Sequence, residues 1–128
     1  MKEKILLTML VGIVLSFSLG AAMADEPISA RALYEMDAAE AAETYKGKPV
    51  VVKGFAVCVG PDVYSLPSVE LSDEPDGKSY VLCVLPYGDV FKLGDFQKGQ
   101  ELTMTGEFRG GGGGSKRVVL KQSVAVTQ

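Results

Sequence analysis

The spacing of apolar positions changes near Gly47, from a helical repeat to an alternating one. From Ala30 to Tyr45 apolar residues recur at steps of three and four among good helix formers, which predicts one amphipathic helix. Ser29 caps its start in this interpretation, and Gly47 ends it. The segments that follow are rich in β-branched residues and separated by Gly, Pro and Asp turns. We expect strands at Pro49–Val59, Val63–Leu71, Ser79–Leu85, Glu101–Phe108 and Lys116–Val126.

The segment between the third and fourth expected strands, Pro86–Gln97, contains a small apolar set and predicts a short helical connector. Five strands with a helical insert between the third and fourth are the chain order of the OB-fold, a small Greek-key barrel. We therefore expect a mainly β protein, a five-stranded OB-fold barrel with an N-terminal helix packed on it. Gly54, in the middle of the first strand, predicts a bend around the barrel.

The first 24 residues have the layout of a cleavable signal peptide. Lys2 and Lys4 precede an apolar run from Ile5 to Leu19, and small residues stand at Ala22 and Ala24. The alternative is an anchoring helix, but the run is short of the ~20 residues that span a bilayer. The sequence predicts a leader (1–24), a helical segment (25–46) and a barrel (47–128). Since no cysteine lies near residue 24, we expect a periplasmic or secreted protein with no lipid anchor and no stable membrane insertion after cleavage.

The composition narrows the possible chemistry. The chain has no His and only two Cys, which excludes Ser-His-Asp and Cys-His catalysis, His-ligated metals and four-thiolate zinc sites. No pair of carboxylates has a recognisable acid–base context, and no cofactor motif is present. The formal net charge of -3 argues against general adhesion to nucleic acid or anionic lipid. We expect a binding protein rather than an enzyme.

The two cysteines, Cys58 and Cys83, fall on the first and third expected strands. In an exported chain the first interpretation is a structural disulfide, which would stabilise the fold by ~3 kcal/mol. The alternatives are two buried free thiols or a reactive thiol. The first and third strands of a simple meander are not neighbours, so geometry is the weakest part of the disulfide prediction.

Candidate ligand-binding residues surround the glycine-rich loop predicted over Arg109–Ser115, which holds five consecutive glycines but not the order of a P-loop. Basic residues at its base could hold phosphate against bare glycine amides, or the loop is a flexible hairpin tip with solubilising charges. The expected strands carry Phe55, Tyr64, Tyr80 and Phe108, which either stack on bases or fill the core. The predicted ligand-binding set is Lys53, Tyr64, Arg109, Lys116 and Arg117.

The chain carries four short motifs in a set order: Tyr45-Lys46-Gly47-Lys48 with Gly54, Val81-Leu82-Cys83-Val84, the segment from Phe96 to Gly106, and Val119-Leu120-Lys121. Together these motifs resemble the bacterial tRNA_anti-like OB-fold family. The resemblance extends from Ile28 to about Ser123, and the periplasmic BOF proteins are the nearest alternative family. Members often carry a cysteine where this chain has Gln122-Ser123, and many are lipoproteins.

The resemblance implies that this non-enzymatic module binds an oligonucleotide, and we expect binding through the barrel face between the glycine loop and the loop that joins the first two strands. The alternative is a structural or stress-related protein whose partner is an envelope protein or peptide.

Overall fold

The computed structural model describes residues 26–61 and 65–126. The predicted leader and the candidate residue Tyr64 lie outside the described residues. Among the residues described, no helix has the length and apolar character needed to cross a membrane.

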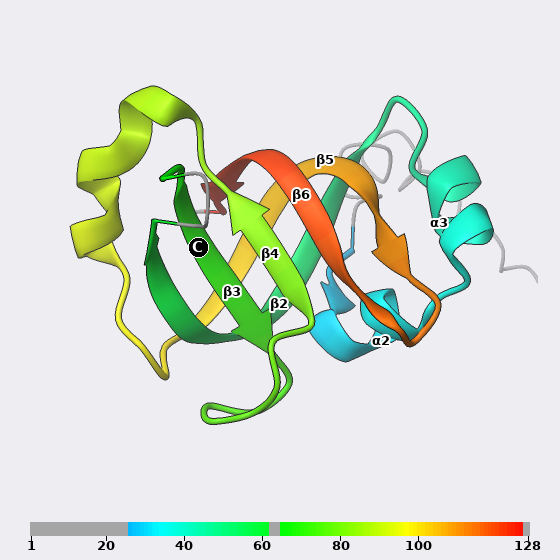
Figure 1. Cartoon of the computed structure of the whole chain (residues 1–128), viewed down its shortest axis with the longest axis horizontal. Coiled ribbons are helices and arrows are strands. Elements are labelled where there is room, and N and C mark those ends of the chain that lie inside the picture. Colours follow the sequence, from blue (N-terminus) through cyan, green and yellow to red (C-terminus); the bar gives the residue numbers. More distant parts are fainter. Residues whose placement is uncertain (1–25, 62–64, 127–128) are drawn as a thin grey trace, which may run out of the picture.

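A closed β-barrel forms the body of the protein (Figure 1). Its strands are β2 (Pro49–Pro61), β3 (Pro67–Ser72), β4 (Val81–Val84), β5 (Glu101–Gly112) and β6 (Lys116–Ala125). They pair in the order β2-β3-β4-β6-β5, and β5 returns to β2 to close the barrel. All these pairings are antiparallel except the one between β4 and β6. The predicted five-stranded OB-fold is confirmed.

The long strand β2 bends at Gly54, as its sequence predicts. Its first half pairs with β5 and its second half with β3, and Phe55 belongs to both pairings. A Cβ at Gly54 would lie 2.6 Å from the carbonyl oxygen of Ser72, so no side chain fits there without movement. The short β1 (Ile28–Ser29) adds in parallel beside the bend, opposite Val52 and Lys53.

The helical segment is two short helices, and the prediction of one continuous helix is wrong. Helix α2 (Ala30–Glu35) is capped by Ser29 as expected, and α3 (Ala38–Thr44) begins after Asp37. The Asp37 carboxylate accepts a hydrogen bond from the Glu40 amide and so starts a new helix. Asp side chains compete for backbone amides in this way, which disfavours them inside helices.

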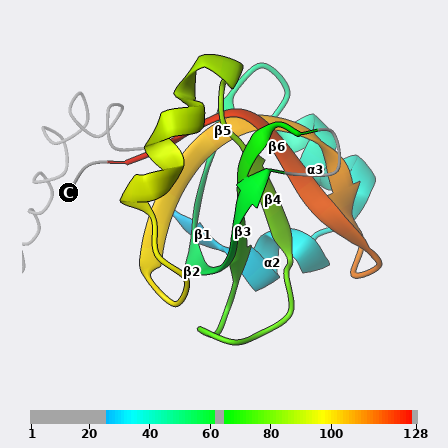
Figure 2. The same ribbon diagram turned by 60° about the vertical axis from the view of Figure 1, so that its left-hand side comes forward.

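Helix α2 closes one end of the barrel, and the connector lies at the other end (Figures 1 and 2). Ala30 and Leu33 are fully buried in the core, while α3 packs against β5. The largest fully buried aliphatic side chains come from α2 and from all five barrel strands: Leu33, Val50, Val52, Val69, Leu71, Val81, Met104, Val118 and Leu120.

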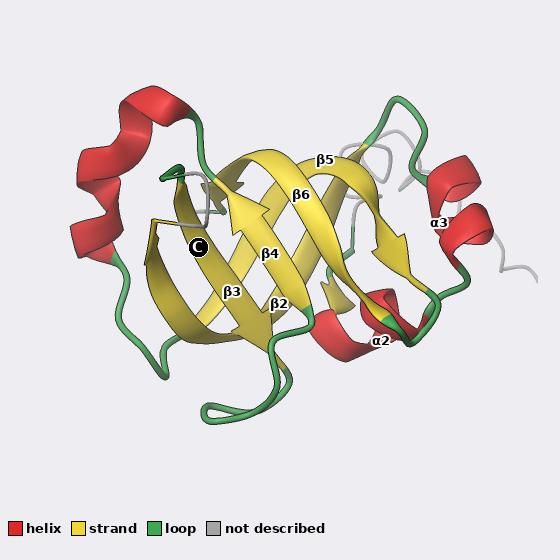
Figure 3. Cartoon of the chain, in the orientation of Figure 1, coloured by secondary structure: helices red, strands yellow, loops and turns green. Residues whose placement is uncertain are grey.

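The predicted connector is present as η1 (Tyr87–Asp95), a 3₁₀ helix between β4 and β5 (Figure 3). It buries none of its own residues. The predicted glycine loop is wrong in extent, because β5 continues through Gly112 and only residues 113–115 form the turn. Gly110 and Gly112 pair with β6 across register shifts, in left-handed conformations that glycine adopts easily.

Candidate binding surfaces

The glycine hairpin is fixed against the C-terminal end of α2. The amide of Gly113 donates to the carbonyl of Met36 at 2.8 Å, and the amide of Gly114 donates to the carbonyl of Tyr34 at 2.9 Å. The Tyr34 hydroxyl donates in return to the Gly114 carbonyl. A Cβ at Gly112 would lie 2.9 Å from the Met36 carbonyl oxygen. The hairpin is therefore a helix cap rather than a free tip, and these two amides are not available to a phosphate.

Three of the four predicted basic residues that the structure describes form ion pairs with different carboxylates. Lys53 lies 3.6 Å from Glu101, and Arg109 lies 3.1 Å from Glu107. Arg117 lies 2.8 Å from Glu70, which is far away in the sequence. Lys116 is exposed at the start of β6. The structure therefore does not gather these residues into one phosphate site at the hairpin.

The structure corrects the predicted disulfide, because both cysteines are free thiols. Cys58 is exposed on β2 and Cys83 is buried on β4, with β3 between them. Two strand spacings amount to about 10 Å, whereas bridged Cα atoms lie within about 7 Å. Burial raises the pKa of Cys83 to about 12. The pKa of Cys58 is also raised, by partial burial first and then by Glu70, so neither thiol is activated as a nucleophile.

The outer face of β2, β3 and β4 carries a carboxylate flanked by two basic residues. Glu70 lies opposite Cys58 on β2 and opposite Leu82 on β4. Arg117 lies 2.8 Å from Glu70, and Lys98 lies in the turn whose next residue, Gly99, donates to the carbonyl of Ala56 on β2. Both basic side chains favour the Cys58 thiolate electrostatically, against the effect of Glu70. We call Lys98, Glu70 and Arg117 the strand-face cluster. It holds two positive charges and one negative charge.

Two of the four expected stacking residues pack against the core of the barrel. The rings of Tyr80 and Tyr34 lie 4.8 Å apart, and those of Phe108 and Tyr45 lie 6.4 Å apart. Tyr80 and Phe108 pack against the core, which confirms the core interpretation for these two. Phe55 is half-buried.

The strongly exposed aromatic side chains of the described residues are Tyr87 (76%) and Phe91 (74%) on η1. Sequence reasoning missed Tyr87 and assigned Phe91 to the small apolar set of a short helical connector. The surrounding sequence gives no signal that the connector leaves this surface open.

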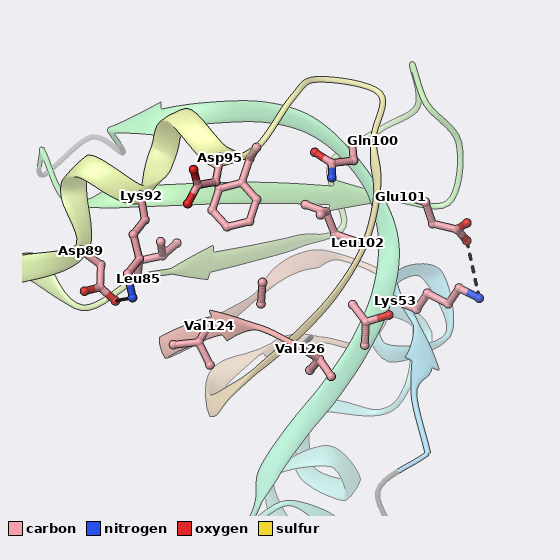
Figure 4. A pocket seen from close by; sticks show the side chains of 13 residues that line it. Lys53, Leu85, Asp89, Lys92, Asp95, Gln100, Glu101, Leu102, Val124 and Val126 are labelled. Carbon is pink, nitrogen blue, oxygen red and sulfur yellow. Dashed lines mark ion pairs between the residues drawn. The ribbon is translucent and has the colours of Figure 1, made fainter. Parts of the chain in front are cut away.

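A groove of about 640 Å³ lies between η1 and the barrel (Figure 4). Leu85, Leu102 and Phe96 contribute apolar surface, and Val124 and Val126 line it from the end of β6. Five charged side chains line it: Lys53, Asp89, Lys92, Asp95 and Glu101. Asp89 pairs with Lys92 at 3.5 Å, and Figure 4 shows this pair away from the Lys53–Glu101 pair.

Comparisons with known proteins agree with the fold. The family model described as tRNA_anti-like matches residues 22–124. The structure is similar to the crystal structure of a "putative nucleic acid-binding lipoprotein" from Klebsiella pneumoniae subsp. pneumoniae MGH 78578, with a TM-score of 0.62 and 17% sequence identity. The similarity covers 84% of this chain and 97% of that chain. Among curated proteins, none matches.

Proposed function

Because this chain belongs to the tRNA_anti-like family of OB-fold proteins, we propose that it is an exported, non-catalytic module that binds single-stranded nucleic acid. The observation that carries the proposal is the strand-face cluster, which stands on the part of the barrel that OB-folds commonly use. OB-folds bind oligonucleotides over their second and third barrel strands, here β3 and β4, and the adjoining loops.

The charges of this face suit a phosphate backbone better than the net charge of the whole chain suggests. Arg117 keeps 42% of its side chain exposed while it contacts Glu70. A guanidinium group has five N–H donors, so a phosphate oxygen can accept hydrogen bonds from those N–H groups of Arg117 that do not contact Glu70. Lys98, in the turn beside β2, adds a second positive charge near Cys58.

Export and the lack of catalysis are parts of the same proposal. The leader pattern in residues 1–24 supports export, as does the lipoprotein nature of the Klebsiella protein of similar fold. The absence of His and the raised pKa of both thiols support a role in binding without catalysis.

Fluorescence anisotropy with a labelled single-stranded 12-mer tests this function. Two phosphate contacts predict that log K falls with log salt concentration at a slope of about -1.4. Arg117→Ala should weaken binding and reduce the slope by about 0.7. Arg31→Ala is the matched control, since Arg31 forms an exposed ion pair with Glu35 on α2. No binding at low salt, or binding that salt does not affect, would contradict the proposal.

A further inference from the structure

The groove beside η1 is separate from the strand-face cluster and has a different chemistry. We propose that it is a second binding site, for an extended peptide that combines apolar and basic side chains. The site does not depend on the proposed nucleic-acid function. It is the place where the protein would contact another protein through a short unfolded segment.

The groove contains exposed apolar side chains that a bound peptide would cover. Val124 and Val126 are 41% and 37% exposed, although they lie beside the buried Leu85 and Leu102. Covering such side chains removes apolar area from water at about 25 cal/mol per Å². Tyr87 and Phe91 of η1 are exposed as well, but they do not line the groove.

The charges of the groove select a basic partner. Three carboxylates, on Asp89, Asp95 and Glu101, face two ammonium groups, on Lys53 and Lys92. Each lysine already pairs with a carboxylate, at Glu101 and Asp89. Asp95 has no ion pair within residues 26–61 and 65–126. The groove therefore presents one uncompensated negative charge, which attracts a lysine or arginine and repels a phosphate backbone.

The backbone of β6 gives the peptide a strand to pair with. Pairing of β6 with β4 ends at Leu120, whereas its pairing with β5 continues to Ala125. In the described part of the chain, no strand pairs with the β4-facing edge of residues 121–125. Val124 and Ala125 of this segment line the groove. An extended peptide can add to such an edge through main-chain hydrogen bonds, while neighbouring pockets select its side chains.

The test uses the purified protein and two fluorescein-labelled heptapeptides, one of alternating valine and lysine and one of alternating valine and glutamate. We expect the basic peptide to bind at least tenfold more tightly. Asp95→Asn should weaken it about threefold, which is the size of one exposed ion pair. Glu35→Gln is the control, because it removes an exposed carboxylate on α2 and should change nothing. Val124→Lys places a cation in the groove and should abolish binding of the basic peptide.

Equal binding of the two peptides, or no effect of Asp95→Asn and Val124→Lys, would overturn the inference. The 12-mer is titrated without the peptide, because a lysine-rich peptide binds an oligonucleotide directly. Asp95→Asn should leave oligonucleotide binding unchanged; tighter binding by this variant would mean that nucleic acid occupies the groove, which ends the peptide proposal and also contradicts binding on the strand-face cluster. If the oligonucleotide does not bind to the protein at all, the proposed function is wrong, and the peptide proposal for the groove is unaffected.

Discussion

The packing of the glycine hairpin on α2 predicts that two neighbouring glycines respond differently to the same substitution. Gly113 has a φ of +71° and open space where a Cβ would stand. Gly112 has a φ of +106°, and its added Cβ would meet the Met36 carbonyl oxygen at 2.9 Å. Gly113→Ala therefore adds backbone strain alone, while Gly112→Ala adds strain and a steric conflict with the helix end.

The expected costs follow from these two contributions. Left-handed backbone costs an alanine about 1 kcal/mol, and a steric conflict in a tightly packed site adds about 2 kcal/mol. We expect Gly113→Ala to lose about 1 kcal/mol of unfolding free energy and Gly112→Ala about 3 kcal/mol. With a urea slope of about 1.5 kcal/mol per molar, the midpoints fall by about 0.7 M and about 2 M.

Urea unfolding followed by circular dichroism measures both midpoints, and hydrogen exchange gives a second readout. In the unaltered protein the Gly113 and Gly114 amides should exchange slowly, because they donate to the carbonyls of Met36 and Tyr34. In Gly112→Ala both amides should lose protection. Equal losses of stability for the two variants, together with fast exchange of these amides in the unaltered protein, would refute the packed hairpin.

Four further predictions concern the helices and the thiols. Leu33→Ala, which empties a fully buried position at the closed end of the barrel, should cost about 3 kcal/mol in a urea titration; a loss below about 1 kcal/mol would mean that α2 does not close the barrel. Asp37→Ala should cost about 1 kcal/mol and Asp37→Asn much less, since the amide also caps a helix, and equal costs would reject the cap. Ellman's reagent should detect Cys58 alone in the native protein and Cys83 only after unfolding, because burial protects the second thiol. The alkylation rate of Cys58 should keep rising at pH values above the ordinary pKa of a thiol, because burial and then Glu70 raise the pKa of Cys58. Glu70→Gln removes the second effect and should increase the rate at pH 8; a lower rate in this variant would contradict the prediction.

The sequence predicts the barrel well because its strongest signals are local. Alternation and turn residues mark the strands, and Ser29 and Gly54 have the roles that their chemistry suggests. The break in the helix is equally local in origin, but Asp37 is compatible with either a helix interior or a cap. Propensity alone does not decide between them, because the cap forms through one hydrogen bond to the Glu40 amide.

The binding surfaces are harder to predict, because their partners are distant in the chain. Arg117 and Glu70 are 47 positions apart, and the sequence around either residue does not indicate that the two side chains are in contact. A run of glycines permits both a mobile loop and a close backbone approach, and only the position of α2 selects the second. Tyr87 and Phe91 are exposed because no helix or strand within residues 26–61 and 65–126 covers them, and the amino-acid composition does not reveal such an arrangement.

A titration of the isotope-labelled protein with a single-stranded 12-mer, followed by amide NMR spectra, tests the proposed function most directly. The amides around Glu70, Lys98 and Arg117 should shift on binding, with the effect reduced by added salt, while those of Asp95 and Val124 in the groove stay in place. Shifts confined to the groove, or no shifts at low salt, would contradict nucleic-acid binding on the face of β3 and β4.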